Sequence, residues 1–268
     1  PGYFGDVERY EKVTVKGIDP HNKKVTIKAE GFLARIFQHE IDHLEGHLFI
    51  EKATNLRRIA DHPEEKEIVY NNPLRIVFMG TPDFSVPTLR ALVEAGHSIV
   101  GVYCQPDKQK GRGKQIQMPP VKEAALSLDL PVYQPITLRD DAVQKELIDL
   151  APDVIVVIAY GKILPPWLIR LPKYGCINIH ASILPKYRGA APIHYAILNG
   201  DTKTGVTIMH MDDGLDTGDI IDIAEIDILP DETTGDLFNR IAELGARTIS
   251  PVLDKWVNGE IISMPQDN

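Results

Sequence analysis

The sequence is poor in cysteine, in long apolar runs and in net positive charge. Its 268 residues contain only two cysteines, Cys104 and Cys176, too few for a disulfide framework, which indicates a reducing cytoplasm. No apolar run reaches the ~18 residues of a membrane-spanning helix, so we expect no membrane partner. The net charge of −9 argues against DNA and against diffuse affinity for RNA. The first residue is not methionine, so we expect the sequence to begin inside a longer protein.

The composition is otherwise that of a globular protein, with 43% hydrophobic and 25% charged residues. It changes along the chain, because residues 51–73 are rich in charge and end in Asn71, Asn72 and Pro73, as a connector does. We therefore predict three parts: a small α+β segment at residues 1–55, a linker at 56–73 and a larger domain at 74–268.

Strand and helix patterns alternate throughout the larger part. We predict strands at residues 74–79, 97–104, 132–133, 153–158, 176–179, 206–211 and 220–228. We predict helices near residues 85–95, 121–128, 140–150, 191–198 and 234–256. This alternation favours a doubly wound, mostly parallel α/β sheet. The first turn, residues 80–84, lacks the G-x-G-x-x-G pattern, which argues against a dinucleotide.

Three polar residues of the larger part have the chemistry of acyl transfer. Asn178 and His180 lie two residues apart in a strand pattern, so both side chains should point to one face. Asp216 lies in a turn flanked by glycines, where its carboxylate can approach the histidine. An amide, an imidazole and a carboxylate can together stabilise an oxyanion and move protons. Taken singly, each residue also fits a strand cap, a core histidine or a turn residue.

The shorter part contains the pattern H-E-x-x-H at His39, Glu40 and His43. Two histidines one helical turn apart can bind a divalent metal, and the glutamate can activate a metal-bound water. Two unrelated histidines on a helix would give the same pattern. The surrounding segments QHEIDHLEG (residues 38–46) and PGYFGDVER (residues 1–9) resemble peptide deformylases.

The deformylase resemblance implies Zn or Fe bound by His39, His43 and the cysteine of an E-G-C-L-S motif. That motif is absent from the sequence, and both cysteines belong to the larger part. We therefore expect residues 1–55 to be an inactive remnant, with a vestigial metal site at His39 and His43 and Glu40 as the former base. A working metallohydrolase is the alternative.

From residue 74 onward the chain resembles methionyl-tRNA formyltransferases. The matching segments are VFMGTPDF (77–84), QPD (105–107), GRGK (111–114), NIHASILP (178–185), RGAAPI (188–193) and GLDTG (214–218). The resemblance implies a Rossmann-like fold and formyl transfer from 10-formyltetrahydrofolate to the amino group of initiator methionyl-tRNA. The family carries a C-terminal β-barrel that grips the tRNA, and the sequence ends before it. We therefore expect intact folate chemistry, weakened tRNA affinity and a monomer.

The resemblance gives roles to the polar residues. Asn178 would donate a hydrogen bond to the formyl oxyanion, and His180 would donate another or shuttle a proton. Asp216 would orient His180 and help to remove the proton from the attacking amine. The residues expected to line the folate site are Ser182, Ile183, Leu184 and Pro185.

A basic stretch supplies the expected contact with tRNA. Lys108, Lys110, Arg112 and Lys114 fall within seven residues, either as a solvated loop or as a functional one. The family resemblance implies that Arg112 enters the acceptor arm, and Lys114 would contact phosphates, with further phosphate contacts from Lys186 and Arg188.

Three other functions fit parts of these patterns. A glycinamide ribonucleotide formyltransferase uses the same amide, imidazole and carboxylate, and an enzyme that formylates amino sugar nucleotides is a weaker candidate. A fusion without catalytic activity is the third.

Overall fold

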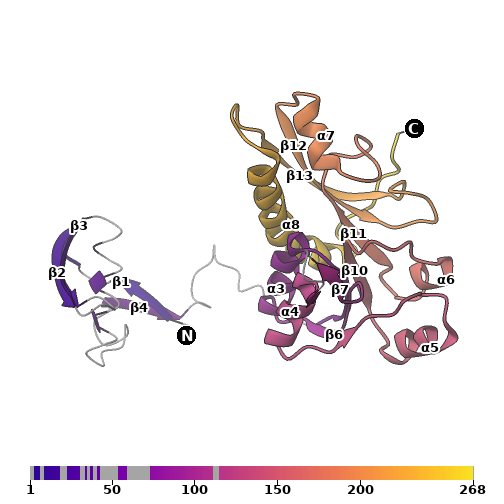
Figure 1. The fold of residues 1–268 in the computed structure, drawn as a ribbon, viewed down its shortest axis with the longest axis horizontal. Helices are drawn as coiled ribbons and strands as arrows, with labels where there is room; N and C mark the ends of the chain where they lie inside the picture. Colours follow the sequence, from indigo (N-terminus) through magenta and orange to yellow (C-terminus); the bar gives the residue numbers. More distant parts are fainter. Residues whose placement is uncertain are drawn as a thin grey trace. The chain divides into compact units, whose positions relative to one another are not determined.

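The computed structural model describes residues 3–6, 9–18, 23–30, 34, 37–38, 41–42, 54–58, 73–110 and 115–267. The chain divides into two units, Pro1–Val69 and Tyr70–Asn268 (Figure 1). The strand β4 (Thr54–Arg58) crosses the boundary expected between residues 55 and 56, so regular structure continues into the segment interpreted as a linker.

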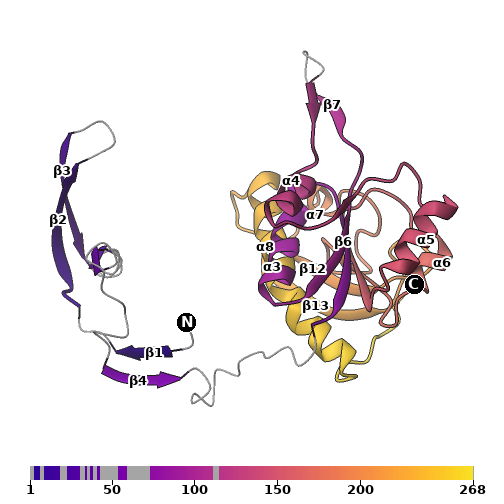
Figure 2. The same cartoon turned by 90° about the horizontal axis from the view of Figure 1, so that it is seen from below.

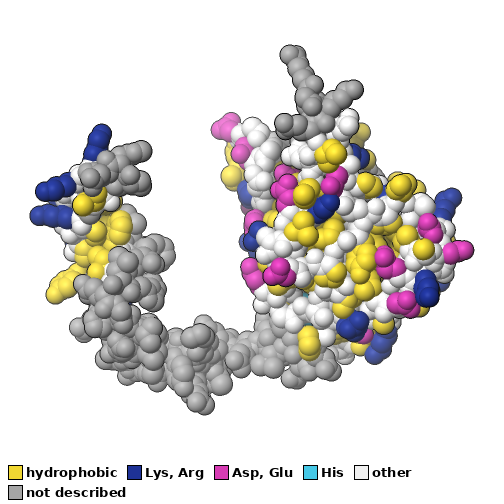
Figure 3. Space-filling model, turned by 60° about the horizontal axis from the view of Figure 1, so that its bottom comes forward, with side chains coloured by type: hydrophobic (Ala, Val, Ile, Leu, Met, Phe, Trp, Pro, Cys, Tyr) yellow, Lys and Arg dark blue, Asp and Glu magenta, His cyan; other side chains and the backbone are white. Residues whose placement is uncertain are grey.

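Unit 1 contains two pairs of antiparallel strands. β1 (Tyr3–Asp6) pairs with β4, and β2 (Lys12–Ile18) pairs with β3 (Lys24–Glu30). The second pair lies in the part of the chain that was expected to be a small α+β segment. In β2 and β3 the lysines alternate with apolar residues, and Lys and Arg side chains gather on one side of this unit in Figure 3. Residues 34, 37–38 and 41–42 are helical.

Unit 2 is built on a seven-stranded sheet with the strand order β13-β12-β11-β10-β5-β6-β9. The strands are β5 (Arg75–Gly80), β6 (Ser98–Tyr103), β9 (Val132–Tyr133), β10 (Val154–Ile158), β11 (Cys176–His180), β12 (Lys203–His210) and β13 (Ile220–Asp227). The first five run parallel, and β12 and β13 add an antiparallel edge. The prediction of a doubly wound, mostly parallel sheet is confirmed.

Helices cover both faces of this sheet (Figures 1 and 2). They are α3 (Val86–Glu94), α4 (Pro120–Ser127), α5 (Asp141–Asp149), α6 (Pro166–Ile169), α7 (Pro192–Leu198) and α8 (Thr234–Val257). The start of α8 is fixed by a capping box, in which Thr233 and Asp236 satisfy each other's main-chain amides. None of the helices among the described residues is both long and apolar enough to cross a bilayer.

Alternate residues of the central strands pack into two separate cores. Ile76 and Phe78 of β5 belong to the core that contains α3, α4 and α8, whereas Val77 and Met79 belong to the core that contains α5 and α6. Because side chains alternate along a strand, continuous apolar runs are required when both faces are covered. The same alternation decides which residues of β10 and β11 point to each face of the sheet.

Two elements differ from the sequence prediction. The short helix α6 was not predicted, because its four residues, which begin with Pro166, are too few to show a helical period. The basic stretch, expected to be a loop, contains a small antiparallel hairpin of β7 (Lys108–Lys110) and β8 (Gln115–Gln117). β7 rises away from the sheet in Figure 2.

Candidate active site

Strand β11 carries the first two site residues on one face. Ile177 and Ile179 point into the core with α3 and α8, so Asn178 and His180 point to the opposite face. There they continue the row that begins with Cys176, which is buried against α6. As predicted, the amide and the imidazole therefore lie side by side at the carboxyl end of the strand.

The turn between β12 and β13 brings Asp216 to this pair. Its Oδ2 atom lies 3.6 Å from Nδ1 of His180, and its Oδ1 atom accepts a hydrogen bond from Nδ2 of Asn178 at 3.4 Å. Asp216 has a φ of 52°, a left-handed conformation that costs roughly 1–3 kcal/mol unless the surroundings support it. Two residues further on, position 218 requires glycine, because a Cβ there would overlap the main-chain oxygen of His210.

A loop before α7 completes the hydrogen bonding of the site. The main-chain amide of Gly189 donates to Oδ2 of Asp216 at 2.8 Å. The main-chain oxygen of Tyr187 lies 2.9 Å from Nε2 of His180. Since a carbonyl oxygen can only accept, this hydrogen bond places a proton on Nε2. Nδ1, the other ring nitrogen, faces Asp216.

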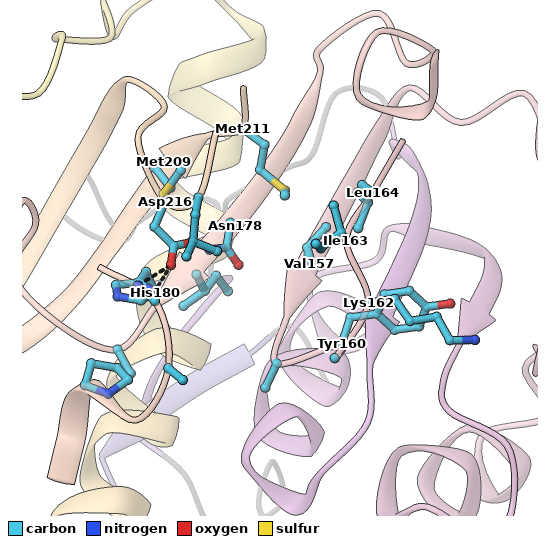
Figure 4. A pocket seen from close by; sticks show the side chains of 18 of the residues that line it. Val157, Tyr160, Lys162, Ile163, Leu164, Asn178, His180, Met209, Met211 and Asp216 are labelled. Carbon is cyan, nitrogen blue, oxygen red and sulfur yellow. Dashed lines mark hydrogen bonds and ion pairs between the residues drawn. The ribbon is translucent and has the colours of Figure 1, made fainter. Parts of the chain in front are cut away.

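These residues form one wall of a pocket of about 700 Å³ (Figure 4). The opposite wall comes from the segment that follows β10 and is mostly apolar. Tyr160, Ile163 and Leu164 belong to this segment and Val157 to β10, whereas Met209 and Met211 lie on the side of Asp216 and Asn178. Residues after β5, among them Pro82 and Phe84, also line it. The pocket thus lies outside the carboxyl ends of the strands where the sheet reverses its order, the usual ligand site of such folds.

The apolar wall is held by hydrogen bonds to its main chain. The carbonyl oxygen of Tyr160 accepts from Oγ1 of Thr81 at 2.9 Å and from Nε2 of Gln105 at 3.0 Å. Lys162 donates to the main-chain oxygen of Ile136 at 2.9 Å, and burial lowers the pKa of its ammonium group. This wall was not predicted from the sequence. A glycine-containing segment directly after a buried parallel strand was the available signal.

The segment of residues 182–185, expected to contact folate, does not line this pocket. None of Ser182, Ile183, Leu184 and Pro185 is among the described residues that line the pocket. Thr207 explains their position, because its hydroxyl donates to the main-chain oxygen of Ser182 at 2.7 Å and accepts from the amide of Leu184 at 3.0 Å. These bonds fold the segment against β12, where Leu184 packs on Met209.

Comparisons with known proteins agree with this geometry. The family model described as "Formyl transferase" matches residues 74–253. The chain belongs to the formyl transferase family. The model described as "Polypeptide deformylase" matches residues 1–59, in line with the resemblance of the shorter part.

Among the curated relatives of this chain are proteins named methionyl-tRNA formyltransferase. The one from Alkaliphilus oremlandii is 52% identical over 195 residues, which are 73% of this chain and 63% of the relative. The one from Pelotomaculum thermopropionicum is 51% identical over 193 residues, which are 72% of this chain and 62% of the relative. The chain thus spans less than two thirds of the length of these relatives.

Solved formyltransferase structures share the fold of unit 2. Glycinamide ribonucleotide transformylase 1 from Symbiobacterium toebii is 18% identical with a TM-score of 0.59, covering 73% of this chain and 95% of that one. An N-formyltransferase from Helicobacter canadensis, in complex with folinic acid and dTDP-3-aminofucose, is 22% identical with a TM-score of 0.56, covering 73% of this chain and 68% of that one.

The residues predicted to contact tRNA are only partly described. Arg112 and Lys114 lie outside the described residues, between β7 and β8. Lys186 and Arg188, expected to contact phosphates, are already engaged: Lys186 pairs with Asp201 at 2.7 Å, and Arg188 donates to side-chain and main-chain oxygens near the C-terminus.

The N-terminal metal pattern also falls outside the described part of the chain. This applies to His39, Glu40 and His43, so the vestigial site stays a prediction. Among the residues that the structure does describe, no group of three or more His, Cys, Asp and Glu could hold a metal. Both cysteines are buried in unit 2.

Proposed function

We propose that this chain transfers a formyl group from 10-formyltetrahydrofolate to the amino group of initiator methionyl-tRNA. The observation that carries the proposal is the meeting of Asn178, His180 and Asp216 at one wall of the pocket. The likeness to proteins named methionyl-tRNA formyltransferase supports the acceptor. The complex of the Helicobacter canadensis enzyme with folinic acid supports a folate as the donor.

The reaction forms a bond between the amino nitrogen and the formyl carbon and then breaks the bond from that carbon to N10 of the folate. Negative charge develops on the formyl oxygen in the tetrahedral intermediate. The amide of Asn178 has two N–H groups, of which one points to Asp216. The second can donate to the oxyanion, and such a donor is typically worth about 3–4 kcal/mol of transition-state stabilisation.

The proton of the attacking amine has a route through the same wall. Because Nε2 of His180 is held by Tyr187, the proton exchanges at Nδ1, next to the carboxylate of Asp216. The imidazole and the carboxylate can together take the proton from the amine and return it to N10 as the folate leaves. The atoms balance: formyl-methionyl-tRNA and tetrahydrofolate are the products.

The apolar wall suits the flat ring system of a folate. Ile163 offers its exposed side chain across the pocket from Asn178, and the buried side chains of Val157 and Leu164 also line the pocket (Figure 4). We assign the folate contacts to this wall rather than to residues 182–185. The tRNA contacts are assigned to the hairpin of β7 and β8, in which the Lys108 side chain is exposed.

Formylation by the full chain tests the proposal. We expect the chain to formylate charged initiator tRNA at high RNA concentration, measured as formyl-methionine released from the tRNA, and we expect His180→Ala to lower kcat at least about 100-fold.

A panel of acceptors separates the alternatives. Turnover of glycinamide ribonucleotide or of an amino sugar nucleotide, without turnover of tRNA, would assign the chain to another formyltransferase. No turnover of any acceptor by a chain that unfolds cooperatively would reject formyl transfer. Hydrolysis of a formyl-methionine peptide, lost with a chelator, would instead show that residues 1–59 act as a deformylase.

A further inference from the structure

The last described residues of unit 2 return to the turn that carries Asp216. Met264 forms an antiparallel bridge with Ile220, with N···O distances of 2.7 and 2.8 Å in the two directions. The Ser263 hydroxyl donates to Asp219 at 3.1 Å. The main-chain bridge fixes the segment along β13 and brings Gln266 beside residues 216–218.

Gln266 uses both ends of its side-chain amide there. Nε2 donates to the main-chain oxygen of Asp216 at 2.9 Å and to that of Gly218 at 2.7 Å. Oε1 accepts from Nε of Arg188 at 2.9 Å. Arg188 also donates to the main-chain oxygen of Asp267 at 3.3 Å. One side chain therefore connects the Asp216 turn to the loop that precedes α7.

That loop is the one that supports the other groups of the site. Arg188 stands between Tyr187, whose carbonyl oxygen meets His180, and Gly189, whose amide donates to the Asp216 carboxylate. A shift of either loop would change the separation of 3.6 Å between His180 Nδ1 and Asp216 Oδ2.

We propose that Gln266 is a positioning residue, which holds the Asp216 turn against the loop of residues 187–189 and so sets the carboxylate at His180. The inference rests on the proposed function. Only an amide fits the position, because two carbonyl oxygens face Nε2 and a guanidinium faces Oε1. The turn requires such support, since Asp216 adopts a left-handed conformation that most residues avoid.

Substitution of Gln266 in the full chain tests the proposal. Gln266→Glu keeps the shape of the side chain but sets carboxylate oxygens against two carbonyl oxygens. We expect it to lower kcat about 30-fold, and Gln266→Ala about 10-fold, because small errors in the placement of reacting groups are costly. The KM for the formyl donor should change less than about threefold, because Gln266 does not touch the apolar wall.

Ser263→Ala is the matched control. It removes a hydrogen bond between the same segment and the Asp219 side chain and leaves both contacts of Gln266 with residues 216 and 218 in place, so kcat should stay within about twofold of the original chain. A Gln266→Glu variant with unchanged kcat, or a loss in Ser263→Ala of equal size, would overturn the proposal.

A second measurement is independent of turnover. The Gly189 amide proton, which donates to the Asp216 carboxylate, should shift upfield in the NMR spectrum of Gln266→Glu and stay in place in Ser263→Ala. An unshifted Gly189 signal would reject the positioning role even in an active enzyme. An inactive original chain with the expected shift would reject the proposed function while leaving the positioning role supported.

Discussion

The two walls of the pocket are built in different ways. On the polar wall, Asn178, His180 and Asp216 come from a strand and a turn, and each is held by a hydrogen bond of definite geometry. On the apolar wall, Leu164 is packed and only 4% exposed, whereas Ile163 is 91% exposed and offers its surface to a ligand. The difference indicates two roles. The hydrogen-bonded residues of the polar wall carry out the chemistry, and the apolar area of the other wall contributes the affinity for the ligand.

Removing the amide of the polar wall should have the largest effect. We expect Asn178→Ala to lower kcat about 100- to 1000-fold with little change in KM for the formyl donor, because the donor acts mainly on the oxyanion. Steady-state formylation at varied donor concentration measures both constants. Asn258→Ala, at the end of α8, is the control. A rise in KM with an unchanged kcat would show that Asn178 serves binding, and the distinction between the walls would fail.

Substitution of Gly218, in the Asp216 turn, should have the second largest effect on turnover. Gly218→Ala places a Cβ on the main-chain oxygen of His210, so the backbone must move, at a cost of about 1–3 kcal/mol in the free energy of unfolding. The carboxylate moves with it, and kcat should fall. Urea unfolding and steady-state kinetics give the two quantities.

Gly235→Ala is its matched control, because a Cβ there meets only Thr233 Oγ1 at 3.8 Å. Gly235 lies in the first turn of α8, where alanine should leave stability equal or slightly higher. Equal stability of Gly218→Ala and the original chain would show that the turn tolerates displacement.

Breaking the apolar wall should have a smaller and different effect. Ile163 is exposed and lines the pocket, so Ile163→Ala removes ligand contact without opening a cavity in the core. We expect the KM for the formyl donor to rise about 3- to 10-fold, in line with the loss of one to two buried methylene groups, while kcat stays nearly constant.

Ile262→Ala provides the comparison for Ile163→Ala. Ile262 is 86% exposed and is not among the described residues that line the pocket, so its removal should leave KM unchanged. If Ile163→Ala lowered kcat and left KM unaltered, the apolar wall would take part in the chemistry.

The strands and helices of unit 2 and the polar wall of its pocket can largely be predicted from the sequence, because they depend on the spacing of residues that are close together in the chain. Asn178 and His180 share a face through the alternation of one strand, and α8 begins at a capping box that can be read from Thr233 and Asp236. Strand and helix ends agree within about three residues, as caps and apolar runs decide them locally.

What the sequence does not reveal depends on contacts between distant segments. Gln266 lies 50 residues from Asp216, and no local pattern connects the two. Residues 182–185 carry a family motif, yet Thr207 on β12 folds two of them away from the pocket. The apolar wall becomes a wall only because β10 and β11 are neighbours in the sheet.

Alkylation of the cysteines should have the smallest effect on turnover, because neither thiol reaches the pocket. Cys176 shares the face of Asn178 but is fully buried, as is Cys104, and burial raises the pKa of both thiols, that of Cys104 to about 11. Iodoacetamide at neutral pH should therefore leave kcat and KM unchanged. Because the folded state keeps the protonated thiol, its contribution to stability is complete below the usual pKa of 9.0 and is lost as the pH rises towards about 11. Urea unfolding at a series of pH values should show this loss of stability, and the loss should be smaller in Cys104→Ala. If alkylation abolished turnover of the folded chain, a thiol would take part in the chemistry.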